Sequence, residues 1–256
     1  MTVPPIALTQ EYGPAGAPLV VLGPSIGTSS MLWEQVIPLL SDRFRVVAWD
    51  LPGHGRAAAA TGPFTVGELA DAVAQAVGGS KPFLYAGVSL GGAVGLELLL
   101  RHPELVKAAA IVCSGASIGQ PETWRERAEQ VRAQSTSARI IPSAQVWFAP
   151  GSIEREPDLT GRLLHVLQDA DDESYARCCE ALAEYDVRDR LGEITAPVLA
   201  VWGEHDTATP EASAAEVANG VRNGRLERIA GAAHHPPAER AQETADLLRD
   251  FFEAKG

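Results

Sequence analysis

Residues 82–101 read PFLYAGVSLGGAVGLELLLR, and the turn at their centre decides the fold. Residues 82–88 form an apolar run typical of a buried strand, and residues 93–101 have the periodicity of a helix. Gly87-Val88-Ser89-Leu90-Gly91 therefore joins a strand to a helix, which is the context of a nucleophile elbow. In such a turn, larger side chains at the glycines would collide with the strand and the helix. The alternative is a glycine-rich turn that contains a serine by chance. Such a turn needs no strand before it and no helix after it, whereas both patterns are present here.

Apolar runs like the one before Ser89 recur along the chain and are typical of strands buried on both faces. They occupy residues 18–22, 45–49, 82–88, 108–113, 197–202 and 225–229. Helical patterns alternate with them at residues 33–40, 65–77, 93–101 and 239–253. The alternation predicts an α/β fold with a mostly parallel, wound sheet flanked by helices.

One region interrupts the alternation. Between about Ser117 and about Leu191 no strand pattern is present, whereas residues 123–134, 160–169 and 172–184 have amphipathic helical patterns. Gly, Pro and Ser indicate breaks at Pro142-Ser143 and at Pro150-Gly151-Ser152. We therefore predict a helical cap over residues 117–191, inserted into a core formed by residues 1–116 and 192–256.

Composition excludes several classes of function. Lys and Arg number 21 and Asp and Glu 33, which gives 256 residues a formal charge of −12 and argues against binding of nucleic acid or anionic membranes. Residues 1–12 do not resemble a secretory signal, and no apolar stretch reaches the length of a membrane span. We expect a cytoplasmic protein, and its oligomeric state cannot be derived from these features.

The cysteines are Cys113 and the adjacent pair Cys178 and Cys179. An odd number with two neighbours is a poor disulfide framework, and no zinc-binding spacing accompanies them, so we expect reduced thiols and no metal. A redox role for the pair is possible in principle, but packing is favoured. Since neighbouring residues on a helix point in different directions, one thiol is expected inside the cap and the other at its surface or in a pocket.

A serine hydroxyl is a weak nucleophile, so it needs a general base and a group that orients the base. The carboxyl ends of the later strands are where such groups collect in a wound sheet. Asp206 follows one of these strands and is the candidate acid, with Glu204 as its competitor. His234 or His235 follows the next strand and is the candidate base.

Three further histidines have different expected positions. His205 follows its strand too closely to act as the base and is expected at the surface. His102 precedes Pro103 and is expected at a helix end, facing the negative pole of the helix dipole. His165 lies in the cap, either at its surface or in a pocket.

Acyl transfer also requires hydrogen-bond donors for the oxyanion. The backbone N–H of Leu90, directly after the nucleophile, is one candidate. The second is expected in the loop Gly23-Pro24-Ser25-Ile26-Gly27-Thr28, after the first buried strand. Ile26 is the preferred donor there, because proline has no N–H.

Taken together, these motifs resemble the α/β-hydrolase superfamily over nearly the whole chain. The resemblance depends on Asp50-Leu51-Pro52-Gly53-His54-Gly55, the elbow, the late aspartate and the later histidine. It implies that His54 has a structural role and is not the base.

A narrower resemblance is to the 3-oxoadipate enol-lactonases. It is carried by Ser25-Ile26-Gly27-Thr28, Val146-Trp147-Phe148-Ala149-Pro150-Gly151, the stretches 175–179 and 186–191, and the acid loop 203–210. It implies Ser89 as nucleophile, Asp206 as orienting acid and His234 as base, since Ala232-Ala233-His234 matches the family. Ser25 and Trp147 are implied in substrate binding, although Trp147 could instead pack the cap on the core.

The implied activity is a serine carboxylic-ester hydrolase that converts the enol-lactone, a small anionic substrate, to 3-oxoadipate through an acyl-enzyme, in the breakdown of aromatic compounds. No cofactor or metal is implied. The sequence departs from the family where Gln145-Val146 precede Trp147, since a basic residue is common there; Arg139 or Arg56 could replace it as the partner of the substrate's carboxylate. An esterase or lactonase for another small ester is the alternative function, and a non-catalytic ligand-binding relative is a further one.

Overall fold

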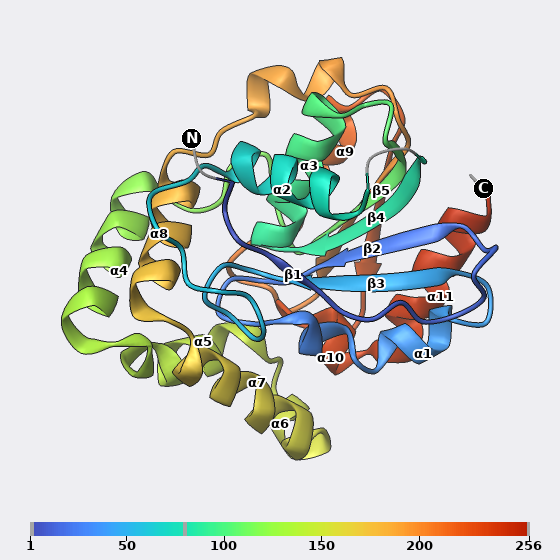
Figure 1. Ribbon diagram of the computed structural model, residues 1–256. Helices are drawn as coiled ribbons and strands as arrows, with labels where there is room; N and C mark the ends of the chain where they lie inside the picture. Colours follow the sequence, from blue (N-terminus) through green and yellow to red (C-terminus); the bar gives the residue numbers. More distant parts are fainter. Residues whose placement is uncertain (1–2, 79–80, 255–256) are drawn as a thin grey trace.

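A single sheet forms the centre of the molecule (Figure 1). The computed structural model describes residues 3–78 and 81–254. Within these ranges seven strands follow the order β1-β3-β2-β4-β5-β6-β7. They are β1 (Ala7–Leu8), β2 (Leu19–Gly23), β3 (Arg45–Asp50), β4 (Phe83–Val88), β5 (Val106–Val112), β6 (Val198–Gly203) and β7 (Gly224–Ile229). Only the pairing of β1 with β3 is antiparallel among them. The predicted α/β fold with a mostly parallel sheet is confirmed.

Burial of the strands follows their place in the sheet. All six residues of the central strand β4 are buried, as its continuous apolar run predicted. The two residues of β1 carry too short a pattern to be predicted. At the opposite edge, β7 exposes most of its residues, so the prediction of a strand buried on both faces is wrong there. Its charged residues Arg225, Glu227 and Arg228 suit an edge strand, because charges there discourage pairing with other chains.

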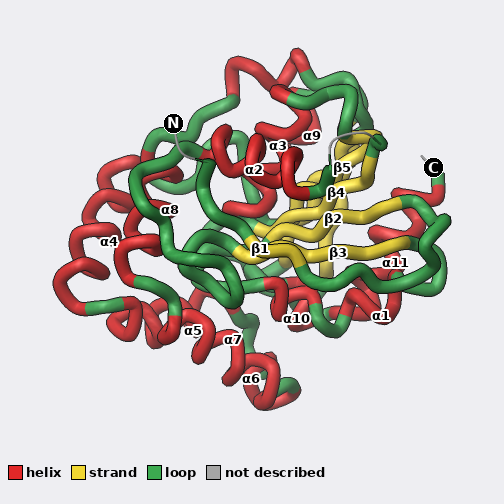
Figure 2. The backbone as a smooth tube through the Cα atoms, viewed as in Figure 1, coloured by secondary structure: helices red, strands yellow, loops and turns green. Residues whose placement is uncertain are grey.

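Helices cover both faces of the sheet. In Figures 1 and 2, α2 (Val66–Ala76), α3 (Leu90–Arg101) and α9 (Glu211–Gly220) lie on one face, and α1 (Val36–Leu40) and α11 (Ala241–Glu253) on the other. The helix predicted at 93–101 begins three residues earlier, at Leu90. The helix predicted at 33–40 is a 3-10 turn, η1 (Ser30–Trp33), followed by α1, and the last predicted helix consists of α10 (Pro236–Glu239) and α11.

Helical segments fill the stretch between β5 and β6. They are α4 (Pro121–Gln134), η2 (Thr136–Arg139), α5 (Ile140–Trp147), α6 (Ser152–Arg155), α7 (Pro157–Asp169), α8 (Asp172–Ala183) and η3 (Arg188–Glu193). The break predicted at Pro142-Ser143 is wrong: Pro142 lies in the first turn of α5, where a missing N–H costs no helical hydrogen bond. An antiparallel bridge between Ser117 and Asp186 joins the two ends of this stretch. The exact cap boundaries, 117 and 191, stay a prediction.

Helices α4 and α8 lie side by side in the cap (Figure 1). Arg132 of α4 forms ion pairs of 2.7 Å with both Glu173 and Glu180 of α8. Cys178 and Cys179 are both fully buried in α8, so packing is confirmed as their structural role, and the expectation that one faces the surface or the pocket is wrong. The reason is that α8 is covered on several sides rather than along one stripe.

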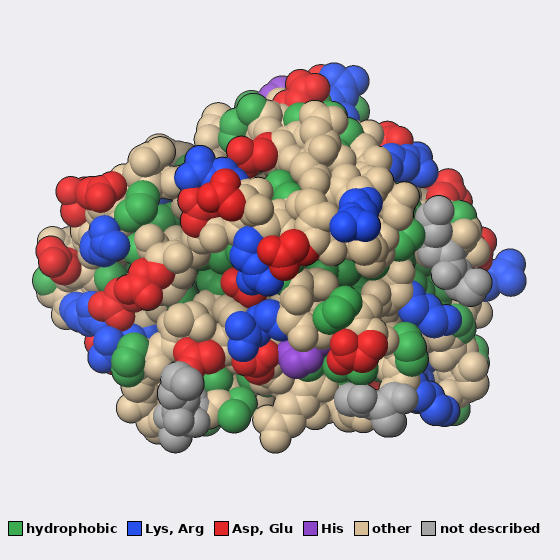
Figure 3. Space-filling view, turned by 90° about the horizontal axis from the view of Figure 1, so that it is seen from above, with side chains coloured by type: hydrophobic (Ala, Val, Ile, Leu, Met, Phe, Trp, Pro, Cys, Tyr) green, Lys and Arg blue, Asp and Glu red, His purple; other side chains and the backbone are tan. Residues whose placement is uncertain are grey.

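Acidic and basic side chains are interspersed on the face seen in Figure 3. Among the residues described, no helix has both the length and the apolar character needed to cross a bilayer.

Candidate active site

Ser89 occupies a strained turn between β4 and α3. Its backbone angles are φ 55° and ψ −115°, a region that residues other than glycine seldom adopt. Two hydrogen bonds hold the turn: the Ser89 N–H donates to the Val112 carbonyl at 3.0 Å, and the Ser114 hydroxyl donates to the Ser89 carbonyl at 2.8 Å. Strain that is held by neighbouring structure in this way is common at functional sites.

The glycines around Ser89 are required by close contacts. A Cβ atom at Gly87 would lie 2.2 Å from the carbonyl oxygen of Gly91, and one at Gly91 would lie 2.6 Å from that of Pro24. Both neighbours are backbone atoms that cannot move away. The steric reason expected for the glycines of the motif is therefore present at these two positions.

Asp206 and His234 meet at the carboxyl ends of β6 and β7. His234 Nδ1 lies 2.9 Å from Asp206 Oδ2, and both side chains are buried. The Thr209 hydroxyl donates to the same carboxylate oxygen at 2.7 Å, while the N–H groups of Ala208 and Thr209 donate to the other at 2.8 and 3.2 Å. Burial by itself would raise the pKa of Asp206, but His234 and the bonds from Thr209 outweigh it and hold this pKa below its ordinary value. The carboxylate is thus charged and aimed at the imidazole.

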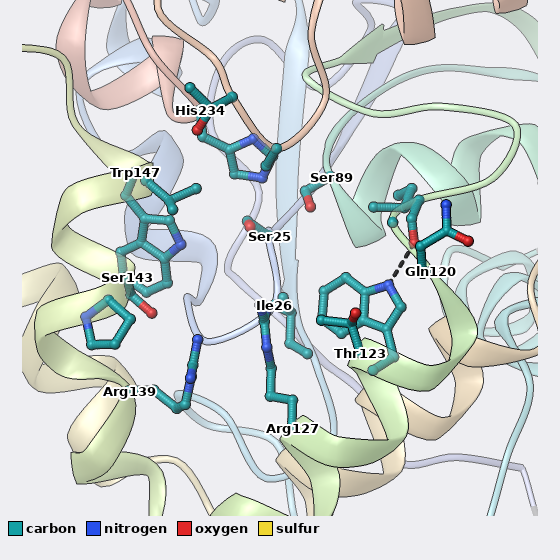
Figure 4. Close-up of a pocket in the computed structure, with 17 residues that line it drawn as sticks. Ser25, Ile26, Ser89, Gln120, Thr123, Arg127, Arg139, Ser143, Trp147 and His234 are labelled. Atoms are coloured by element: carbon teal, nitrogen blue, oxygen red, sulfur yellow. Dashed lines mark hydrogen bonds between the residues drawn. The ribbon is translucent and has the colours of Figure 1, made fainter.

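Ser89 and His234 line the same cavity and lie next to each other at one end of it (Figure 4). Since His234 uses Nδ1 toward Asp206, its Nε2 is the nitrogen left for the serine. Within the described residues no hydrogen bond joins the Ser89 hydroxyl to this ring. Such bonds are often long in unliganded enzymes and shorten when substrate binds.

His235, the competing base, is placed differently. Its ring packs 4.6 Å from the ring of Trp147 and 5.9 Å from that of Phe148, between centroids, and it has no exposed surface. Neither ring nitrogen has a hydrogen-bond partner in the described part of the chain. Burial, helped by the neighbouring His234, lowers its pKa well below the ordinary value. His235 is therefore a neutral side chain packed between core and cap.

The competing acid and three further histidines lie away from the cavity. Glu204 is exposed and accepts hydrogen bonds from Arg228 and from the N–H of Gly231. His205 is exposed, as expected, and so is His165, which lies at the surface of the cap and not in a pocket. His102 ends α3 as expected, and its ring contacts Asp71 at 2.8 Å.

The loop after β2 presents backbone donors beside Ser89. Within the described residues, the N–H groups of Ile26 and Leu90 have no acceptor in the protein. His54 contacts this loop and the turn after β3: its Nε2 accepts from the Gly27 N–H at 3.2 Å, and its Nδ1 contacts the Pro52 carbonyl at 2.8 Å. Because burial lowers the pKa of His54, the ring is neutral and can accept at Nε2. Both nitrogens serve the backbone, in agreement with a structural role.

The two residues implied in substrate binding both line the cavity. The Ser25 hydroxyl is fully buried and has no partner among the described residues. Trp147 forms part of the wall and also packs on His235, so the two roles considered for it are compatible. A buried hydroxyl without a partner is costly, and a ligand atom in the cavity would satisfy it.

The cavity has a volume of about 240 Å³. This is below the usual range of pockets for drug-sized ligands, about 300–1,000 Å³, and suits a small molecule. Arg127 and Arg139 also line it, whereas Arg56 forms an ion pair of 3.2 Å with Asp50 and borders another hollow. Of the two arginines considered for the substrate's carboxylate, Arg139 is thus the one near Ser89.

Cys113, Asp206 and His234 each place one possible ligand atom for a metal within 4.8 Å of the others. A zinc site would need Cys113 as a thiolate, but burial and the charge of Asp206 raise the pKa of this thiol well above its ordinary value. The Asp206 carboxylate is already taken up by His234 and Thr209. This donor set fits a hydrogen-bonded pair better than a metal ion.

Two functional candidates lacked a signal strong enough for the sequence to single them out. Arg127 lies three residues after Trp124, a spacing that places both on one side of α4, but many arginines have such neighbours. Glu239 is buried; its carboxyl accepts from the Ala233 N–H at 2.8 Å, and from the Ala149 N–H and the Ser152 hydroxyl at 2.6 and 2.7 Å. It therefore connects the segment before His234 to the cap.

Comparisons with known proteins agree with this geometry. The chain matches the model of the alpha/beta hydrolase family over residues 20–247. It is 33% identical to 3-oxoadipate enol-lactonase 2 of Acinetobacter baylyi, over 94% of this chain and 91% of that protein. It is 32% identical to a pimeloyl-(acyl-carrier protein) methyl ester esterase of Neisseria meningitidis, over 89% of this chain and 90% of that protein. The solved structure of the enol-lactonase from Burkholderia xenovorans LB400 has a TM-score of 0.92 and 30% identity, covering 97% of this chain and 96% of that one.

Proposed function

The chain belongs to the alpha/beta hydrolase family, and from this premise we propose that it hydrolyses 3-oxoadipate enol-lactone to 3-oxoadipate. The observation that carries the proposal is that Ser89 and His234 line the same small cavity, with His234 paired to Asp206 behind it. The backbone N–H groups of Ile26 and Leu90, which have no acceptor among the described residues, lie next to Ser89. The similarity to two named enol-lactonases supports the choice of substrate.

In the proposed first half-reaction, His234 Nε2 takes the proton of the Ser89 hydroxyl as its oxygen attacks the lactone carbonyl. The N–H groups of Ile26 and Leu90 donate to the oxyanion that forms. Asp206 holds the imidazole in the required tautomer and stabilises the imidazolium. When the ring C–O bond breaks, His234 returns its proton, and the enol that leaves becomes a ketone tethered to the acyl chain.

In the second half-reaction, His234 takes a proton from water, which attacks the acyl-enzyme. The tetrahedral intermediate collapses, the bond to Ser89 breaks, and the proton returns to the serine oxygen. The product carries a new carboxylate. An enol is a better leaving group than an amine, so the enzyme has to remove less of the barrier than a protease does. This route uses only side chains and backbone groups of the protein.

The test is the loss of enol-lactone absorbance with purified protein, compared with Ser89→Ala and with a short p-nitrophenyl ester. We expect rapid loss that depends on Ser89, together with much weaker turnover of the ester. Lactone hydrolysis that is unchanged in Ser89→Ala would refute the mechanism. A physiological function that survives in Ser89→Ala would point to a ligand-binding protein instead.

A second candidate, an esterase or lactonase for another small ester, is favoured by the 32% identity to a methyl ester esterase. The same three catalytic side chains serve both reactions, so the fold does not choose between them. Turnover of simple esters without turnover of the lactone would support this candidate and reject the first.

A further inference from the structure

The proposed oxyanion donors, the N–H groups of Ile26 and Leu90, belong to peptide groups whose carbonyl oxygens are those of Ser25 and Ser89. Because a trans peptide is planar, its C=O and N–H point in opposite directions and turn together. Any contact that holds one of these carbonyls therefore also fixes the direction in which the donor N–H points.

Both carbonyl oxygens accept a hydrogen bond from a buried hydroxyl group. Thr28 Oγ1 donates to the Ser25 carbonyl at 2.8 Å. Ser114 Oγ donates to the Ser89 carbonyl, also at 2.8 Å. Each hydroxyl has this single partner among the described residues. Two segments that lie far apart in the chain thus bind the two donor peptides in the same way.

A strained backbone and a glycine bring the Ser114 hydroxyl to its position. Cys113, directly before it, has φ 44°, in the left-handed region that residues other than glycine seldom adopt. A Cβ atom at Gly92 would lie 2.5 Å from Ser114 Cβ and 2.6 Å from its Oγ. The glycine that follows the elbow motif therefore makes room for Ser114 against the first turn of α3. Strain such as that at Cys113 persists only where the surrounding structure imposes it.

A tight turn places the Thr28 hydroxyl. The Thr28 N–H donates to the Ser25 carbonyl at 3.1 Å and Gly27 has φ 78°, so residues 25–28 form a β-turn. The backbone and the side chain of Thr28 thus bind the same oxygen. A valine at this position has nearly the same shape and would keep only the backbone bond.

The two donor segments are also tied to each other. The Gly91 N–H donates to the Pro24 carbonyl at 2.9 Å, and the Tyr85 hydroxyl donates to the Gly91 carbonyl at 2.7 Å. With the segments joined at these points, rotation of the two donor peptides is the motion that the buried hydroxyls oppose.

We propose that Thr28 and Ser114 are positioning residues of the oxyanion hole, which aim the N–H groups of Ile26 and Leu90 and strengthen them as donors. A hydrogen bond to its carbonyl oxygen polarises a peptide group and makes its N–H a better donor. The gain is largest when negative charge develops on the substrate, so the transition state is stabilised more than the bound ester. The inference rests on the serine mechanism proposed above and extends it to two side chains that do not line the cavity.

The kinetic test removes each hydroxyl in turn, with the enol-lactone or methyl hexanoate as substrate, whichever the wild-type protein turns over. Thr28→Val and Ser114→Ala should each lower kcat by about 10-fold with KM within about threefold, and the double variant should lose about 100-fold. Removal of a direct donor costs more, about 100–1,000-fold. Thr28→Ser keeps the hydroxyl and should have a kcat within about threefold of wild type.

Thr160→Val is the matched control. The Thr160 hydroxyl is likewise buried and donates to a backbone carbonyl, that of Glu156 at 2.7 Å, but it belongs to the cap helix α7. Thr160→Val should therefore lower the free energy of unfolding about as much as Thr28→Val and leave kcat unchanged. An equal loss of kcat in both variants would mean that Thr28 contributes only to stability, and would overturn the inference.

A second measurement needs no turnover. Pentylboronic acid forms a tetrahedral adduct with a reactive serine, in which one oxygen on boron takes the place of the oxyanion. Its affinity, measured by calorimetric titration, should fall in Thr28→Val and in Ser114→Ala by about the same factor as kcat, and should be unchanged in Thr160→Val. Wild-type protein that binds no boronic acid would overturn the inference, because the hydroxyls would have no oxyanion hole to support.

The outcomes separate this inference from the proposed lactonase activity. Parallel losses of boronic acid affinity and of methyl hexanoate turnover, without lactone hydrolysis, would reject the lactone as substrate and leave the inference standing. Lactone hydrolysis that requires Ser89 but is unchanged in Thr28→Val and Ser114→Ala would overturn the inference and leave the lactonase standing.

Discussion

The proposed role of Asp206 depends on the groups that surround its carboxylate. Both of its oxygens accept hydrogen bonds, from Thr209, Ala208 and His234, and these groups keep its pKa below the ordinary value even though it is buried. A neutral amide at this position could not favour the imidazolium and would present a donor where His234 needs an acceptor.

We therefore expect Asp206→Asn to lower kcat for the preferred substrate by about 10⁴-fold, the effect of the same change in the triad of serine proteases. KM should change little, because Asp206 does not line the cavity. The matched control is Glu204→Gln, which alters the exposed carboxylate of the same loop and should leave kcat within about threefold. Steady-state kinetics of the two variants make the comparison, and similar losses in both would contradict the assignment of Asp206.

At the scale of elements, Glu239 joins parts that lie far apart in the chain. Glu239 is the last residue of α10. Its carboxyl accepts from the Ala233 N–H on one side and, on the other, from the Ala149 N–H and the Ser152 hydroxyl at the junction of α5 and α6. Displacement of either element would leave buried donors without partners. The position of the His234 loop is thus coupled to the position of the cap.

Replacement of Glu239 by Gln keeps the volume but puts an NH₂ group against one of these donors. We expect Glu239→Gln to lower the free energy of unfolding by about 1–3 kcal/mol. We also expect kcat to fall by about 10–100-fold, because His234 is shifted relative to Ser89. Ser152→Ala, which removes a single donor on the cap side, should have a smaller effect on both quantities.

Urea unfolding and saturating kinetics on methyl hexanoate measure these two effects separately. A loss of stability with full kcat would mean that Glu239 only holds the cap. Unchanged values of both would show that its hydrogen bonds contribute nothing.

For the whole molecule, the buried neutral histidines predict how stability changes with pH. Burial lowers the pKa of His235 well below 6.5, so the unfolded chain takes up a proton there at a pH at which the folded protein does not. The free energy of unfolding therefore keeps the whole contribution of neutral His235 above the pKa of the unfolded chain. It falls as pH drops below about 6.5. The loss amounts to at most about 1.4 kcal/mol for each pH unit.

His235→Phe should therefore make the free energy of unfolding depend less steeply on pH between 7.5 and 5 than it does in wild type. Phenylalanine also removes two buried nitrogens that have no hydrogen-bond partner among the described residues. His205→Asn, at an exposed histidine next to Asp206, is the control and should keep the wild-type slope. Urea titrations at several pH values give the slopes, and equal slopes for wild type and His235→Phe would show that His235 is not held neutral.

The sequence by itself determined the α/β alternation, the elbow at Ser89 and the loops that carry Asp206 and His234. The physical reason is that these features are local: a buried parallel strand needs a continuous apolar run, and a strained turn needs glycines at fixed positions. Their meeting follows from topology, since parallel strands bring their carboxyl ends to one edge of the sheet. Edge strand β1 and the start of α3 were missed because two residues or one turn carry too little pattern.

Only the tertiary structure gives His234 and His235, neighbours with the same chemistry, opposite surroundings, and this difference supports His234 as the proposed base. It likewise brought Arg127 and Arg139 into the cavity, buried both cysteines of α8 and gave Glu239 its partners on the cap. Each of these outcomes depends on contacts between segments far apart in the chain, where the packing of the cap on the sheet decides which side chain is covered and which one faces a ligand. No local pattern encodes such packing.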